Sequence, residues 1–170
     1  MRIGRAVLGG LGGAMTMSVL AAGLRAVGVP FHLELVLGSL VGPAPGTAAF
    51  ALGLAIHLGV GTLFGLAYGY LFERVWAHGG ALTGVLIGVI HAAFFGVFIG
   101  ITPQFHPHIP ERLLDPGPYF SNTGIVGTIA FFLIHLLYGA IVGGVYGHVP
   151  AEREWSPLAF ARIDRATRAR

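Results

Sequence analysis

The sequence predicts an all-α membrane protein, a four-transmembrane-helix bundle built from two tandem two-helix repeats. Of the 170 residues, 55% are hydrophobic and only 10% are charged, whereas a soluble domain carries about a quarter charged residues. The apolar residues gather in four long stretches, which together with this composition predict a membrane protein. Two similar thirteen-residue segments predict the repeat.

Each apolar stretch is long enough to cross a bilayer. About 20 helical residues span the roughly 30 Å hydrocarbon core at about 1.5 Å per residue. We therefore expect a four-helix transmembrane domain over residues 1–147 and a basic cytoplasmic tail over residues 148–170. The expected helices cover residues 6–27, 47–71, 81–102 and 123–147.

The distribution of arginine predicts the orientation. All ten basic residues are arginine, and eight of them lie in the N-terminal segment, the second loop and the tail. The first and third loops hold one each, Arg25 and Arg112. Because basic residues are enriched on the cytoplasmic side, both termini are expected in the cytoplasm. The net charge of +3 suits anionic lipid headgroups, and there is no basic stripe of the kind that binds nucleic acid.

The internal repeat is the most specific feature of the sequence. Residues 57–69 read HLGVGTLFGLAYG and residues 135–147 read HLLYGAIVGGVYG, so both fit H-L-x-x-G-x-x-x-G-x-x-Y-G without gaps. We interpret the chain as two tandem units whose pseudo-twofold axis runs along the membrane normal. The preceding glycines correspond more loosely, Gly9 and Gly13 to Gly84 and Gly88.

Each repeated segment places small residues along one face of a helix. Residues four apart drift by about 40° around the helix axis, so they form a slowly turning stripe. Small residues at this spacing let two backbones approach closely in lipid, where packing drives helix association. We therefore expect the stripes to form helix–helix contacts. The glycines concerned are Gly61, Gly65, Gly69, Gly139, Gly143 and Gly147.

Three histidines are expected near the middle of the membrane. His57 lies about ten residues inside the second expected helix, and His91 and His135 lie near the middle of the third and fourth. Ionisable side chains at this depth are costly, and they tend to face the bundle interior. The first helix contributes Met15 and Met17 at the same level.

Three roles are open for these histidines. As structural groups, neutral imidazoles would hydrogen-bond across helices to one another, to Thr16 or to backbone carbonyls. As cofactor ligands, two or three of them would bind haem iron or a transition metal, with Met15 or Met17 as a soft ligand. As functional polar groups, the third alternative, they would relay protons or line a path for a small solute. No single-helix metal motif such as H-E-x-x-H is present.

A second group of polar residues lies in the expected outer loops. The third loop reads TPQFHPHIPERLLDPGPY, and the first loop offers a histidine and a glutamate at the equivalent point. His-x-His with nearby carboxylates can chelate zinc, copper or nickel. The prolines equally favour a rigid cap over the bundle. The candidate metal ligands are His32, Glu34, His106, His108, Glu111 and Asp115.

Three segments carry a resemblance to a known family. They are GVPFHLELVLGSL at residues 28–40 and the two repeated segments. With these, the chain resembles an uncharacterised family of small bacterial four-helix inner-membrane proteins, over about residues 5–147. The resemblance implies a bacterial inner-membrane location and a four-helix fold. It supplies no catalytic or binding residues.

The sequence does not favour an enzyme. It contains no cysteine, and no nucleophile–base pair, nucleotide-binding loop or carboxylate pair lies in the apolar stretches. We expect a small polytopic membrane protein that packs with itself or with a larger membrane complex and uses its midplane histidines structurally. The alternative is a haem- or metal-binding, or a proton- or solute-conducting, membrane protein centred on these histidines.

Overall fold

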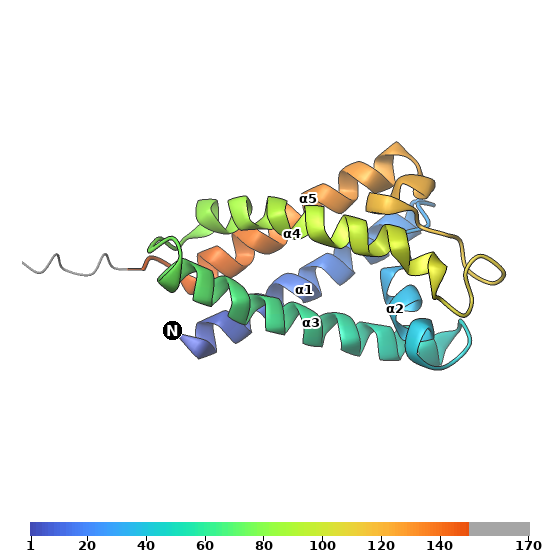
Figure 1. Cartoon of the computed structure of the whole chain (residues 1–170), viewed down its shortest axis with the longest axis horizontal. Coiled ribbons are helices and arrows are strands. Elements are labelled where there is room, and N and C mark those ends of the chain that lie inside the picture. Colours follow the sequence, from blue (N-terminus) through green and yellow to red (C-terminus); the bar gives the residue numbers. More distant parts are fainter. Residues whose placement is uncertain (150–170) are drawn as a thin grey trace, which may run out of the picture.

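The computed structural model describes residues 1–149, and all regular elements within them are helical. The predicted basic tail therefore lies, from residue 150 onward, outside the described residues. Figure 1 shows the long helices side by side, with the N-terminus and the end of α5 at the same end of the molecule. The elements are α1 (Ile3–Ala26), α2 (Leu33–Val41), α3 (Thr47–Arg74), α4 (Ala81–Ile101), η1 (Thr102–Gln104), η2 (Pro118–Thr123) and α5 (Ile125–Tyr146).

Four of these helices are long and apolar enough to cross a membrane. They are α1, α3, the continuous run Ala81–Gln104 formed by α4 and η1, and α5. The predicted all-α fold with four candidate membrane-spanning helices is confirmed, and the protein is a polytopic membrane protein. Large apolar side chains on the outer faces, such as Leu8 and Leu63, are exposed and contact the lipid of a bilayer.

Helix α2 was not predicted. The four long helices begin and end within three residues of the expected limits, but nine residues of the expected first loop form α2. Glu34 lies in its first turn, where a negative charge is favourable. Gly38 of α2 and Gly53 of α3 bring the two backbones into direct contact. This packing stabilises a helix too short to form alone.

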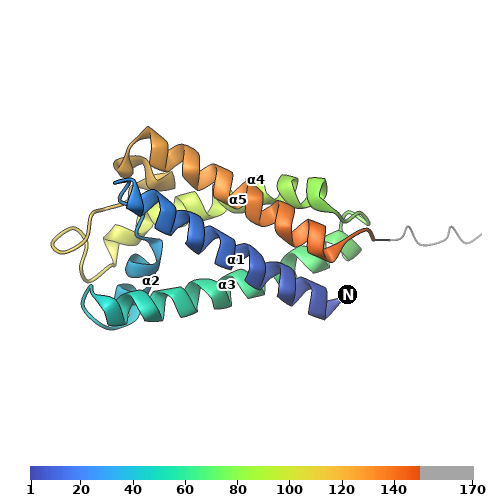
Figure 2. The ribbon, with the colours of Figure 1, turned by 180° about the vertical axis from the view of Figure 1, so that it is seen from behind.

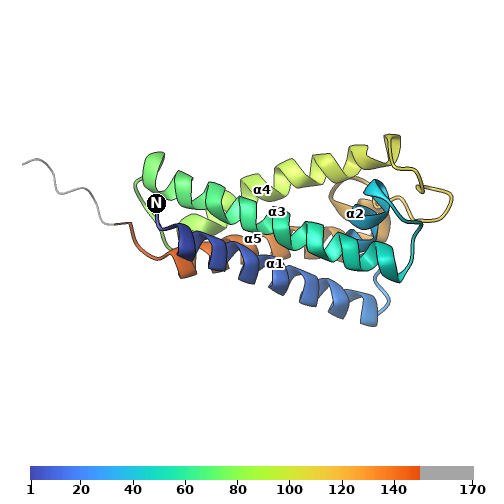
Figure 3. The same ribbon diagram turned by 90° about the horizontal axis from the view of Figure 1, so that it is seen from below.

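The four long helices form an open row rather than a closed bundle. α3 packs against α1, α1 against α5, and α5 against α4, whereas α3 and α4 meet at few points. Figure 2 shows α1 between α3 and α5. Figure 3 shows α2 beside the beginning of α3, at the end of the molecule opposite to the chain's N-terminus. The row therefore leaves a space between α3 and α4, with α2 at one end of it.

Glycines bring the backbones closest together in two of these helix pairs. Gly10 of α1 lies against the backbone of Gly61 and Gly65 in α3, and a Cβ atom on Gly10 would come within 2.6 Å of the Gly61 carbonyl oxygen. Gly84 of α4 lies against the backbone of Gly139 in α5. No side chain other than hydrogen fits at these contacts without moving the helices apart.

The other predicted packing glycines have different surroundings. Gly143 faces the backbone of Gly80, just before α4, and Gly69 faces the Tyr146 ring. Gly147 follows the end of α5 with φ +76°, and no helix backbone lies within 4 Å of where its Cβ would be. Its expected role between helices was therefore wrong. It ends α5, where the left-handed conformation favours glycine.

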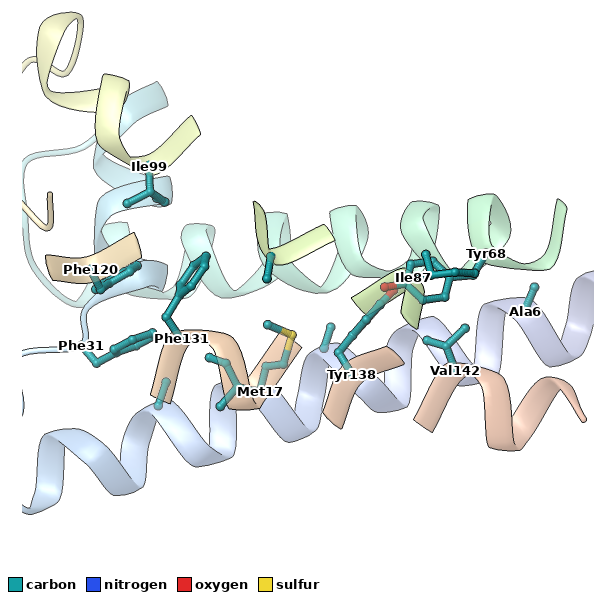
Figure 4. Packing of buried hydrophobic residues seen from close by; sticks show 14 of the residues in the cluster. Ala6, Met17, Phe31, Tyr68, Ile87, Ile99, Phe120, Phe131, Tyr138 and Val142 are labelled. Atoms are coloured by element: carbon teal, nitrogen blue, oxygen red, sulfur yellow. The ribbon is translucent and has the colours of Figure 1, made fainter. Parts of the chain in front are cut away.

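Aromatic side chains fill the end of the molecule that carries η2. Phe31 stacks on Phe120 with ring centroids 4.0 Å apart, and Figure 4 shows Phe131 beside them. Tyr119 and Phe120 have φ of +55° and +60°, which is costly for residues with side chains. These conformations place the Tyr119 ring on Phe132, at 5.3 Å between centroids, and the Phe120 ring on Phe31.

Polar contacts join α1, α3 and α5 at the other end. The amino group of Met1 pairs with Glu73 at 2.7 Å. The Tyr146 hydroxyl donates to the Glu73 carboxylate and accepts from the Arg2 backbone N–H at 3.1 Å. The Arg2 guanidinium donates to the His148 carbonyl at 2.8 Å. Together these contacts hold three helix ends in register.

Candidate functional site

A cavity of about 390 Å³ lies in the space between α3 and α4. Its volume falls in the range of roughly 300–1,000 Å³ that is typical of small-molecule sites. Among the described residues, no Asp, Glu, Lys or Arg side chain lines it. Its apolar wall is formed by Met17, Leu33, Leu37, Leu40, Val41, Ile56, Val60, Phe64, Phe94, Phe95, Phe98 and Ile99.

The cavity opens to the outside of the helix row. Two of its lining residues, Val41 of α2 and Phe94 of α4, are 63% and 64% exposed. Both belong to the apolar surface that would face the acyl chains of a bilayer. A molecule dissolved in the lipid could therefore reach the cavity without crossing water.

All three predicted midplane histidines line this cavity. His57 comes from α3, His91 from α4 and His135 from α5, and each is buried. His57 and His135 lie one helical turn from the glycines Gly61 and Gly139, which contact the neighbouring helix. Residues four apart lie on nearly the same side of a helix, so His57 and His135 face inward together with the glycines that contact the neighbouring helix.

Each histidine has one ring nitrogen held by the protein. The Nδ1 atom of His57 lies 2.9 Å from the Ser18 hydroxyl of α1, and that of His91 lies 3.2 Å from the Tyr68 hydroxyl of α3. Nδ1 of His135 donates to the Phe131 carbonyl at 2.7 Å. Within residues 1–149, none of the three Nε2 atoms makes a hydrogen bond, and none of them is fully buried.

Aromatic rings surround His91. Its ring stacks on Phe64 with centroids 4.4 Å apart and planes 10° from parallel. The ring centroids of His135 and Tyr138 lie 5.1 and 5.2 Å away, edge-on. The Tyr138 hydroxyl donates to the Gly61 carbonyl of α3. His91 and His135 are therefore neighbours in a rigid aromatic setting.

The first helix contributes differently from what was expected. Met17 lines the cavity, but Met15 is 46% exposed and does not. The Thr16 hydroxyl donates to the Gly12 carbonyl of its own helix at 2.9 Å and meets no histidine. Ser18 has the role that Thr16 was expected to have. The buried face of α1 runs from Ala6 through Gly10 to Ser18, a helical periodicity that could have indicated Ser18.

The three histidines do not gather together as the ligands of one metal ion. Among residues 1–149, no three His, Cys, Asp or Glu side chains come close enough together to hold a metal ion. His57 shares the cavity with His91 and His135 but is held separately, by Ser18. The geometry instead offers three separate hydrogen-bonding groups on an apolar wall.

The outer polar residues do not gather into one site either. Nε2 of the buried His106 donates to the Val36 carbonyl at 3.0 Å, and Nδ1 accepts the His108 backbone N–H at 3.1 Å. Both ring nitrogens are thus occupied. His106 joins the loop before η2 to α2, which favours the expectation of a rigid cap over that of a metal site.

The remaining predicted outer ligands make local contacts. Glu34 pairs with Arg25 at 2.9 Å. Asp115 accepts the backbone N–H of Gly117 at 2.7 Å, and Glu111 is exposed. Partial burial, reinforced by the Arg25 charge, lowers the pKa of His32 below its ordinary value.

Comparisons with known proteins give no family for this fold. No protein-family model, curated protein or solved structure matches the chain. The family resemblance drawn from the three sequence segments is thus supported only in its general statement, that the chain is a small membrane protein with four helices. The chain has the four long apolar helices of a small membrane protein.

Proposed function

We propose that this protein binds a small, neutral, lipid-soluble molecule in the cavity between α3 and α4. The observation that carries the proposal is the convergence of three mid-helix histidines on one apolar cavity. Polar side chains are costly inside a bilayer, and they are retained there mainly for function. A largely apolar cavity with a few polar groups is the usual form of a small-molecule site.

A role in helix packing alone leaves this cavity unexplained. The glycine contacts hold α1 to α3 and α4 to α5, and none of them requires a histidine. A protein selected only for packing with itself or a larger complex would close the space, because helix interiors are close-packed. Conduction of protons or solutes is favoured less, since the cavity wall is mostly apolar and the part of the chain that the structure describes contributes no carboxylate to it.

Filling the cavity is expected to remove the bound molecule. Val60 lines the cavity, and a tryptophan there would occupy part of its volume. Solvent extracts of purified wild-type protein, analysed by mass spectrometry, should contain a lipid-soluble compound at about one per chain that the Val60→Trp protein lacks. Leu63→Trp is the matched control, because Leu63 lies on the same helix and is 64% exposed. Identical extracts from wild type and Val60→Trp would refute binding at this site.

We also infer that α1–α3 and α4–α5 are two tandem repeats. The sequence match between residues 57–69 and 135–147 is accompanied by a similarity of contacts. Gly61 faces α1 at Gly10 and Ala14, and Gly139 faces α4 at Gly84 and Gly88. The equivalent glycine of each motif thus contacts the preceding long helix of its own unit.

The proposed location is a bacterial inner membrane with both termini in the cytoplasm. Arg2 precedes α1, Arg5 lies in its first turns and Arg74 ends α3. Figure 1 shows that α1 begins and α3 ends at the same end of the molecule. These three arginines support the orientation, because arginine favours the cytoplasmic side. A green fluorescent protein fused after Arg170 should fluoresce, and alkaline phosphatase at the same place should be inactive. Fusions in the loop near His108 should behave in the opposite way. Active phosphatase after Arg170 would reverse the orientation.

A further inference from the structure

The hydrogen-bonding pattern of the cavity narrows the class of ligand. We infer that the ligand is a quinone-type compound, a flat neutral ring that carries two oxygen atoms, with any apolar chain extending into the lipid. The inference rests on the proposed function, because it names the molecule that the same cavity would take. Three features carry it: the hydrogen-bond partners of the histidines, the absence of charged side chains among the described residues that line the cavity, and the separation of the polar groups.

The partners of His57 and His91 determine which nitrogen of each carries the proton. Among the described residues, the Ser18 and Tyr68 hydroxyls have only these imidazoles as partners. A buried hydroxyl proton without an acceptor is costly, so each hydroxyl donates to Nδ1. The proton of each neutral imidazole is then on Nε2. His57 and His91 therefore present N–H donors to the cavity.

His135 has the opposite arrangement. Its Nδ1 lies 2.7 Å from the Phe131 carbonyl oxygen, which can only accept, so Nδ1 carries the proton. The Nε2 atom of the neutral ring is then an acceptor. The cavity thus presents two donors and one acceptor. The carbonyl oxygens of a quinone can accept hydrogen bonds from His57 and His91. The hydroxyl group of its reduced form, a hydroquinone, can also donate a hydrogen bond to His135.

The ligand must be neutral. Within residues 1–149, no Asp, Glu, Lys or Arg side chain lines the cavity. With the imidazoles neutral, a carboxylate, a phosphate or a cation would therefore be buried there without a counter-charge. The cost of such burial is large in the interior of a membrane. Fatty acids and phospholipid headgroups are therefore disfavoured, whereas an uncharged ring with oxygen substituents meets no such cost.

We expect more than one oxygen atom to meet the three histidines. Within residues 1–149 they are not grouped as the ligands of one metal ion would be. His57 is hydrogen-bonded to Ser18 of α1, whereas the ring centroids of His91 and His135 lie 5.1 Å apart. A simple alcohol has one oxygen, whereas a quinone has two on opposite sides of its ring. Phe64, Phe95 and Phe98 supply ring faces and edges along the wall, which favours a flat partner.

The test compares decylubiquinone with decanol, which has a similar chain and a single hydroxyl. Equilibrium dialysis against the full-length protein in detergent should show at least tenfold tighter binding of decylubiquinone. His91→Leu should weaken that binding by about tenfold or more, because the carbonyl loses a buried donor. Ser18→Ala changes little volume and lets the His57 proton move to Nδ1, so it should also weaken binding. His78→Leu, at an exposed position outside the cavity, should not.

The outcomes separate this inference from the proposed function. Equal binding of decanol and decylubiquinone, or decylubiquinone binding that is unchanged by both His91→Leu and Ser18→Ala, would overturn the quinone assignment. Absence of decylubiquinone binding would also overturn it. The proposed function would survive these results if wild-type extracts still contained a compound that Val60→Trp extracts lack. It would fall only if that comparison showed no difference.

Discussion

Replacing Gly139 with leucine is expected to destabilise the protein by about 1–3 kcal/mol, the usual cost of inserting atoms into a packed interior. Gly139 lies against the backbone of Gly84 and Gly88, and even a Cβ atom there would overlap the Gly84 carbonyl. The leucine can be accommodated only if α4 and α5 move apart. In lipid that separation removes the packing that holds the pair together. Denaturant titration in detergent, followed by circular dichroism, measures the loss.

Gly144 provides the matched control on the same helix. Nothing lies within 4 Å of where its Cβ would be, so Gly144→Leu should leave the unfolding free energy nearly unchanged. The two substitutions add the same atoms to the same helix, and they differ only in the face that receives them. Equal losses for both variants would show that α4 and α5 are not in close contact at Gly139.

Replacing Arg25 with leucine is expected to cost about 3–5 kcal/mol of unfolding free energy, as when one partner of a buried ion pair is removed. The Glu34 side chain is 1% exposed, and its Oε2 lies 2.9 Å from the Arg25 guanidinium. Among the described residues, its other oxygen, Oε1, has no hydrogen-bond partner. Without Arg25, the carboxylate would be a buried charge with nothing to compensate it.

The double variant Arg25→Leu, Glu34→Leu tests the cause of that loss. Removing both charges should restore most of the stability, because no charge is then left buried. Recovery should be incomplete, since Arg25 also donates to the Phe31 carbonyl at 2.8 Å. The same unfolding titration applies to both variants. Wild-type stability in the single variant would mean that Glu34 carries no charge for Arg25 to balance.

The four candidate membrane-spanning helices were predictable, because each one depends only on the residues within its own segment. A hydrocarbon solvent leaves backbone groups no partners other than those within a helix, so about 20 consecutive apolar residues already specify the element. The close approach at Gly61 and Gly139 follows similarly from spacing along one helix. The convergence of three histidines was also predictable, because depth in the membrane and the interior face follow from position along each helix.

The hydrogen-bond partners of those histidines were not predictable in this way. Ser18 and Tyr68 lie far from His57 and His91 in sequence, and which hydroxyl meets which ring depends on how two helices are rotated against each other. The expected contact between Thr16 and a histidine was wrong for this reason. Thr16 and Ser18 are two residues apart on α1, so they face directions about 160° apart.

By itself, the sequence determined that the chain has four helices able to cross a membrane. It also indicated the inward-facing side of the three histidines and of the packing glycines other than Gly147. These properties depend on solvent and periodicity, which act within one helix. Only the tertiary structure decided that the helices form an open row, that α2 packs against α3, and that a cavity remains between α3 and α4. These features depend on the relative placement of separate helices. Contacts between residues distant in sequence set that placement, and no single segment encodes it.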